Sequence, residues 1–177
     1  MTDPGALDLG LRDRAWTVAV QDGTPGIFDT LVRAAKSDEA LARQNASFAL
    51  GYDDDPATSG RSRDLTLDPA FPSSNAFNVI YGQLDGPDTR APAWAWLQKN
   101  FDALLGRVPA FVYPFTFQLL GVFCDTTSGD EARAFGQAKV RQLGTGELEL
   151  QRAMESVAIC TAQKAAHLRD FEALTAH

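Results

Sequence analysis

Residues 92–105 read PAWAWLQKNFDALL and carry a clear helical pattern. Trp94, Leu97 and Phe101 follow one another at intervals of three and four residues, and leucines at 104 and 105 continue the series. Apolar residues at this spacing share one face of an α-helix. The pattern therefore predicts a helix over this range that buries one face, with Gly106 after its last residue.

The chain after this helix contains three further helical segments. Residues 111–123 are largely apolar, and the run of about ten residues after Pro114 favours a buried helix over a strand. Ser128 and Glu131 form a capping box that opens the next helix. Thr145 caps the last and longest helix. The inner face of that helix is expected to hold Leu150, Met154, Val157, Ala158, Thr161, Ala165 and Leu168.

Amphipathic helices also precede residue 92. One is expected over residues 11–20. Thr24 and Pro25 predict the cap and the first position of a second helix. Ser37 predicts the cap of a third, and a shorter helix covers residues 75–84. The inner face of the third helix is expected at Leu41, Asn45, Phe48 and Tyr52.

These elements set the fold class. No segment alternates apolar and polar residues in the way a half-buried strand does. About eight helices joined by short turns favour antiparallel neighbours, and they are too many for a four-helix bundle. We therefore expect an all-α fold over residues 1–177, a single domain in which helical hairpins stack as a HEAT- or armadillo-like solenoid.

Composition excludes several classes of protein. The chain has 177 residues, of which 45% are hydrophobic and 22% charged, as in ordinary globular domains. No run approaches the roughly 20 apolar residues that a membrane span requires. The net charge of -7 disfavours nucleic-acid binding, because phosphate backbones repel an acidic surface. The first residues, Met1–Gly5, show no basic end and no apolar run, so no signal peptide is expected there.

Cys124 and Cys160 leave two alternatives open. They do not form a Cys-x-x-Cys motif, so neither a zinc site nor a redox centre is indicated. Two buried thiols are the first interpretation. The second is a disulfide, which neighbouring hairpins could bring together and which would place the protein in the periplasm or outside the cell rather than in the cytoplasm.

No catalytic, cofactor-binding or metal-binding residue is predicted. The chain has two histidines, His167 and His177, and neither belongs to a His-Glu-x-x-His pattern. The aspartates at 53–55 lack the glycine and the closing glutamate of a calcium loop. Cys124 has apolar neighbours, which raise the pKa of a thiol and do not activate it as a nucleophile. Trp94 and Trp96 are expected to pack in and beside the core and not to form a cation-binding cage.

The motifs above indicate no function, but several segments resemble those of a known protein family. The segment from Trp94 to Asp102 resembles the Trp-x-x-Leu-x-x-Asn-aromatic-Asp signature of the C-terminal helical domain in M1-family zinc aminopeptidases. This is the domain type of the endoplasmic-reticulum and puromycin-sensitive aminopeptidases. Gly121–Cys124 resembles the family's Gly-x-Phe-Cys helix end, and two later segments, 130–135 and 150–157, resemble its last helices. The residues that carry the signature here are Trp94, Leu97, Asn100, Phe101, Phe135 and Glu155.

The resemblance implies a non-catalytic domain of a bacterial-type aminopeptidase. In the family, zinc and the motif that holds the peptide's amino end belong to a preceding thermolysin-like domain, which this chain lacks. The resemblance therefore implies that the partners of this chain are that catalytic domain, in the same polypeptide, and peptide substrates. The C-terminal domain is expected to cover the catalytic cleft and to limit the access of peptides.

Two other functions stay open at this stage. A stand-alone helical module that binds a protein or peptide in its groove fits the same composition. A small-molecule-binding helical domain would need an enclosed apolar cavity with a few polar groups. The coding sequence upstream of Met1 separates the first reading from these two, because a zinc motif there would identify an aminopeptidase.

Overall fold

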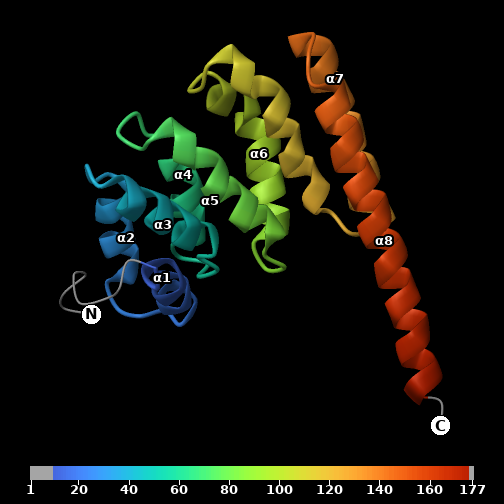
Figure 1. Ribbon diagram of the computed structural model, residues 1–177, viewed down its shortest axis with the longest axis horizontal. Coiled ribbons are helices and arrows are strands. Elements are labelled where there is room, and N and C mark those ends of the chain that lie inside the picture. Colours follow the sequence, from blue (N-terminus) through green and yellow to red (C-terminus); the bar gives the residue numbers. More distant parts are fainter. Residues whose placement is uncertain (1–9, 176–177) are drawn as a thin grey trace. The chain divides into compact units, whose positions relative to one another are not determined.

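A computed structural model describes residues 10–175, with side chains described through Phe171 (Figure 1). Every regular element in this range is a helix, which confirms the all-α prediction. The chain divides into two compact units, the first ending at Val108 and the second beginning at Pro109. The stacking of hairpins into one solenoid domain stays a prediction.

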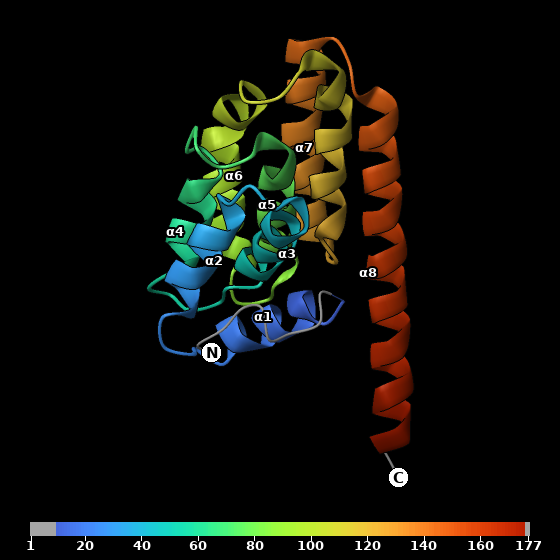
Figure 2. The ribbon, with the colours of Figure 1, turned by 60° about the vertical axis from the view of Figure 1, so that its left-hand side comes forward.

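The first unit is built around α3. This helix packs against α1, α2 and α5, and α5 in turn packs against α6 and the short α4 (Figure 2). The elements of this unit are α1 (Arg12–Gln21), α2 (Ile27–Ala35), α3 (Ala40–Gly51), α4 (Ser59–Leu65), α5 (Ser73–Asp85) and α6 (Arg90–Leu105). Because the other four helices each pack against α3 or α5, the residues at the α3–α5 crossing determine how closely the unit packs.

The start of α2 differs from the prediction. Thr24 does not cap this helix: its carbonyl accepts the N–H of Ile27 at 3.1 Å, which closes a turn with Pro25 and Gly26 at its centre. Gly26 has φ 75° and ψ 3°, the values that the third residue of a type II turn requires. The Pro-Gly pair therefore forms the turn, and α2 begins after it at Ile27.

The buried face of α3 differs in part from the prediction, although Asn45 is buried as expected. Leu41 and Phe48 are partly exposed, at 41% and 39%, whereas small residues fill the interior. The buried apolar residues of this helix are Ala42, Ala46, Ala49 and Leu50. Alanines shorten the distance at which helices can pack, so α3 can contact three neighbours at once.

Two glycines make the closest approach in the first unit. A Cβ atom added to Gly82 of α5 would lie 2.7–2.8 Å from backbone atoms of Gly51 in α3. Real Cβ atoms do not come that close to backbone, so neither helix can tolerate a side chain at this crossing. The crossing in turn brings α5 within hydrogen-bonding reach of the end of α3.

Gln83, the next residue of α5, uses this proximity. Its Nε2 donates to the carbonyl oxygens of Leu50, Gly51 and Asp53 at 3.3, 3.1 and 2.7 Å. The last carbonyls of a helix have no partner within the helix, so the buried amide supplies one from outside. The side chain of Gln83 is completely buried, and its Oε1 accepts a hydrogen bond from Arg63 of α4 at 2.6 Å.

α4 is held by polar contacts. Its buried residues are Ser59, Ser62 and Arg63, and none of them is apolar. Ser62 donates to one carboxylate oxygen of Asp53 at 2.8 Å, and Thr58 donates to the other at the same distance. Burial raises the pKa of Asp53, and these two hydrogen bonds oppose the rise. Burial likewise lowers the pKa of the Arg63 guanidinium.

α6 matches its prediction closely. Trp94, Leu97 and Phe101 are buried, as are Leu104 and Leu105. The indole N–H of Trp96 donates to Asp64 of α4 at 2.8 Å, which places this second tryptophan on the flank of the helix. The apolar stripe of residues 92–105 is therefore the inner face of α6.

The second unit consists of the 3₁₀-helix η2 (Ala110–Val122), α7 (Thr126–Leu143) and α8 (Glu147–Thr175). η2 packs mainly against α8, and it contributes Phe117, Leu119 and Leu120 to the interior. The prediction of a helix in this apolar run is confirmed. Phe111 and Phe115 remain exposed, at 75% and 56%.

The predicted helix starts in this unit are both displaced. Asp125, and not Ser128, caps α7: its carboxylate accepts the backbone N–H of Ser128 at 2.8 Å. The first turn of α8 forms on the carbonyl of Gly146 and not on Thr145. α8 buries Leu150, Ala153, Met154 and Val157, but Leu168 of the predicted inner face is 54% exposed. Within the second unit, α8 extends past the ends of η2 and α7 (Figures 1 and 2).

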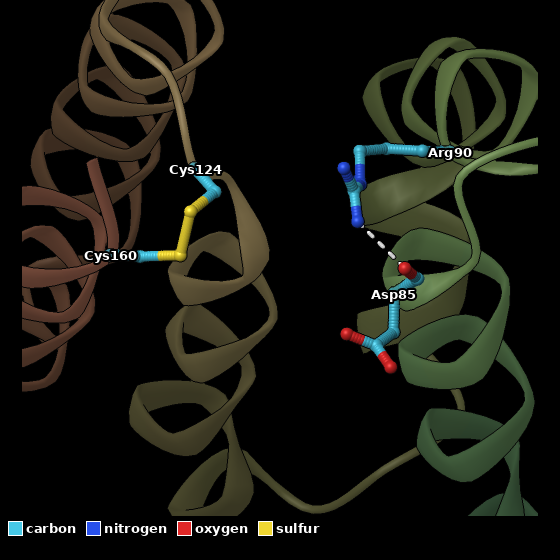
Figure 3. Close-up of a disulfide and its surroundings, with 4 residues drawn as sticks. All are labelled: Asp85, Arg90, Cys124 and Cys160. Carbon is cyan, nitrogen blue, oxygen red and sulfur yellow. Dashed lines mark hydrogen bonds between the residues drawn. A yellow bond between two sulfur atoms is a disulfide. The ribbon is translucent and has the colours of Figure 1, made fainter. Parts of the chain in front are cut away.

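Figure 3 shows that a disulfide joins Cys124, just after η2, to Cys160 in α8. The two Cα atoms lie 5.1 Å apart, within the range that a disulfide spans. No described side chain of α8 after Cys160 is buried. The disulfide therefore lies at the last point where α8 is fixed to the rest of its unit.

We predict that Gly82→Ala lowers the free energy of unfolding by about 2–3 kcal/mol, because the new methyl group overlaps backbone that cannot move aside. Urea unfolding measures this. The matched control is Gly60→Ala in α4, where the nearest atom is the Nη2 of Arg63 at 3.7 Å. That variant should be neutral or more stable by up to about 1 kcal/mol. Equal effects of the two substitutions would contradict the close crossing.

The buried Asp53 carboxyl predicts a pH dependence. Because its pKa is raised in the folded chain, the native state holds this proton more tightly than the unfolded state does. The resulting stability is complete below the ordinary pKa of 3.8 and is lost as the pH rises through the folded value. The free energy of unfolding of Asp53→Asn, taken relative to that of the wild type, should therefore rise from about pH 4 to pH 7. A variant that loses stability relative to the wild type over this pH range would contradict the assignment.

The disulfide predicts that the oxidatively folded chain contains no titratable thiol until it is reduced. Its loop spans 36 residues, for which chain entropy gives a stabilisation of about 3–4 kcal/mol. Replacing both cysteines by alanine should lower the unfolding free energy by that amount. A thiol titration that finds two free thiols in the native, unreduced protein would contradict the disulfide.

Candidate functional site

The residues of the Trp94–Asp102 segment have structural roles. Trp94, Leu97 and Phe101 form the inner face of α6, and the Nδ2 of Asn100 donates to the carbonyl of Trp96 at 2.9 Å within the same helix. None of these side chains lines any of the three surface pockets described below. This part of the signature therefore defines how α6 packs.

Two signature residues lie in the second unit. Phe135 of α7 is half-buried, and the ammonium of Lys139 lies 5.9 Å from the centre of its ring. Glu155 of α8 is exposed and accepts a hydrogen bond from Gln151 at 3.0 Å. Glu155 also lines a surface groove between α7 and α8.

No reactive centre is assembled in the described part of the chain. His167 is exposed on α8, and His177 lies outside the described residues. Within residues 10–171, no three His, Cys, Asp or Glu side chains lie close enough to hold a metal ion. Cys124 and Cys160 are joined to each other, so neither is a thiolate nucleophile.

The Asp53 cluster has the residue types of a catalytic site but not the access. The carboxylate contacts the hydroxyls of Ser62 and Thr58, yet Asp53 and Ser62 are fully buried. A serine nucleophile needs a base beside it and an open path to its substrate. This cluster therefore serves to hold α4 in place.

An acidic hollow of about 310 Å³ lies in the first unit, where α3 and α5 end. Its carboxylates are Asp54, Asp85 and Asp88, and its floor includes Gly51 and Gly82. The C-termini of two helices add partial negative charge to these side chains. Arg90 of α6 donates to the carbonyls of Leu84 and Asp85 at 2.8 and 2.6 Å, which satisfies part of the α5 end (Figure 3).

A larger groove of about 710 Å³ runs between α7 and α8. Its floor is apolar, with Leu150 and Met154 buried and Val140 half-buried. No residue of η2 lines it. The charged and amide side chains along its edges are Arg133, Gln137 and Arg141 on α7, and Glu147, Gln151 and Glu155 on α8. The groove can thus bind a partner through an apolar centre and two oppositely charged edges.

A third hollow of about 520 Å³ lies beside the disulfide. Its lining is mostly apolar, from the two cysteines, Leu168 and Phe171, with Lys164 and His167 at its edge. Leu168 and Phe171 are 54% and 66% exposed. This surface is open on the C-terminal half of α8.

None of these three surfaces was predicted from the sequence. The α7–α8 groove had a readable signal, since on each helix two like charges lie eight residues apart with a glutamine midway between them. The acidic hollow had none, because Asp54 lies about 30 positions from Asp85 and Asp88 and joins them only when α3 and α5 cross.

Comparison with known proteins places the chain in a family. Across the described helices, none combines the length and the apolarity needed to cross a bilayer. A search of the curated proteins gave no match. Residues 1–159 match the model of the family described as the ERAP1-like C-terminal domain, in agreement with the resemblance found in the sequence. The matched range covers α6, η2 and Cys124 and ends one residue before Cys160, and the chain therefore belongs to the ERAP1-like C-terminal domain family.

Proposed function

We propose that the chain is the non-catalytic C-terminal domain of an M1-type zinc aminopeptidase and that it covers the catalytic cleft and limits the access of peptides. The observation that carries this proposal is the family match over residues 1–159. The signature residues of α6 support it, because they build a helical core and not a reactive centre.

A domain that covers a cleft must keep its conformation when a peptide contacts it. Each unit meets this requirement in its own way: the first through the buried bonds of Gln83, the second through the disulfide. A rigid cover excludes bulk water and large folded substrates from the reaction space. Selection by size would then follow from the position of the cover and would need no catalytic group within it.

The zinc of such an enzyme would be held by the preceding catalytic domain. The residues of this chain do not fit a zinc site, since His167 is exposed and no group of three suitable ligands occurs within residues 10–171. No step of peptide hydrolysis is therefore assigned to the described side chains.

The disulfide bears on the location of the parent enzyme. Structural disulfides persist in oxidising compartments. Together with the family match, the Cys124–Cys160 bridge supports a parent enzyme that works in the periplasm or outside the cell.

A second candidate is a stand-alone helical module that binds a protein or peptide. The observation in its favour is the α7–α8 groove, whose apolar floor and charged edges are typical of a peptide- or helix-binding surface. The length of the natural polypeptide distinguishes this module from the aminopeptidase domain.

The test uses the natural polypeptide that carries this sequence, recovered with an antibody against the 177-residue chain. It should be much larger than 19.1 kDa and should release N-terminal residues from short peptides faster than from folded proteins. A chelator should abolish this activity, and the purified 177-residue chain should have none with or without zinc. A natural polypeptide of 19.1 kDa without peptidase activity would overturn the proposal in favour of the stand-alone module.

A further inference from the structure

We propose that the α7–α8 groove is a self-association surface, on which the same groove of a second copy of this chain docks. The proposal rests on how charge is arranged along the two edges of the groove and not on the aminopeptidase assignment.

The two edges repeat one pattern with opposite charge. On α7 the order is Arg133, Gln137, Arg141, and on α8 it is Glu147, Gln151, Glu155. In both helices the interval is four residues, which keeps the three side chains on one side of the helix. Each pair of like charges is separated by eight residues, or about 12 Å along the helix axis.

The arginines of this pattern have no carboxylate partner among the side chains that the structure describes. Within the described residues, neither Arg133 nor Arg141 forms an ion pair or a hydrogen bond, and Glu147 has no such partner either. Glu155 interacts only with the amide of Gln151. The groove holds the opposite charges too far apart to pair across it, so both edges are available to an occupant.

The hairpin geometry aligns the edges. α7 ends at Leu143 and α8 begins at Glu147, so the two helices run in opposite directions from a short turn. Arg141 therefore lies at the level of Glu147, and Arg133 lies two turns further on, at the level of Glu155.

In the proposed dimer, the two copies are related by a two-fold axis parallel to α7 and α8. It places α7 of one copy over α8 of the other at the same level, as in a four-helix bundle made of two hairpins. Each Arg141 then meets the partner's Glu147, and each Arg133 meets the partner's Glu155. The interface is isologous, so every contact occurs twice.

A second copy fits better than an unrelated partner for a specific reason. An occupant must present a basic edge and an acidic edge at this spacing on one face, and the chain's own groove is such a face. The second unit carries eight acidic and six basic residues, so long-range repulsion between its copies is small.

The strength expected of this contact is modest. The floor residues Leu150 and Met154 are already buried within one chain, so the charged edges supply most of the attraction. Exposed ion pairs are weak and sensitive to salt, which predicts a dissociation constant of about 10 μM to 1 mM at low ionic strength. Raising the salt from about 0.05 M to 0.5 M should weaken association, because the screening length falls.

The test is analytical ultracentrifugation of the full 177-residue chain and three variants. Arg133→Glu with Arg141→Glu makes both edges acidic, and Glu147→Arg with Glu155→Arg makes both edges basic. Each of these should weaken self-association by at least about tenfold, yet an equimolar mixture of the two should form a heterodimer. The control is Arg152→Glu, an exposed charge reversal on α8 outside the groove, which should associate like the wild type.

Several results would overturn the proposal. They are a wild-type chain that stays monomeric up to about 1 mM at low salt, a mixture of reversed variants that does not associate, or a control that loses association equally. Circular dichroism of each variant ensures that a loss of association is not a loss of folding, since the substituted side chains are exposed.

Discussion

The side chain of Gln83 is the point on which the first unit depends. Its amide donates to the last carbonyls of α3, its oxygen accepts from Arg63 of α4, and its own backbone carbonyl accepts the hydroxyl of Thr89 at the start of α6. One buried residue of α5 therefore satisfies polar groups of three other elements. This is possible only because Gly51 and Gly82 let α3 and α5 approach within the reach of a glutamine. A leucine at position 83 would fill the volume and leave those carbonyls buried without donors, which costs more than the burial gains.

The second unit meets the same need to fix its helices by different means. α7 contributes small residues to its interior, and at Gly129 and Gly136 an added Cβ would collide with Val157 and Leu150 of α8. This close packing fixes α8 between Leu150 and Val157. The disulfide fixes α8 at Cys160, next to the end of η2. A backbone group of this unit is paired with a residue nearby in the sequence, as where Asp125 caps α7. The first unit is thus joined by a buried polar network, and the second by packing and one covalent bond.

This difference explains which features could be predicted from the sequence. α6 was predicted correctly because large apolar residues mark its inner face, and the all-α class followed from several such stripes. The inner face of α3 was not, because alanines fill it and its leucine and phenylalanine at 41 and 48 are partly exposed. The predicted helix starts were wrong at Thr24, where a turn forms instead, at Ser128, where Asp125 caps the helix earlier, and at Thr145, where the first turn forms on the carbonyl of Gly146. The role of Gln83 depends on contacts with residues about 30 positions away, which no local pattern reveals.

Burial distinguishes the polar and charged groups that stabilise the fold from those that can contact another molecule. Asp53, Arg63 and Gln83 are buried and bonded to one another or to backbone, so changing them alters stability before it alters any surface. The edges of the α7–α8 groove are exposed, and their arginines form no ion pair with the described residues. An exposed charge without a partner adds little to folding, so a use for this pattern has to be sought outside the folding of the chain. Contact with another surface is such a use, because the pattern matters only when a second set of charges faces it. The packing of α7 against α8 in the second unit then sets the spacing of these edges.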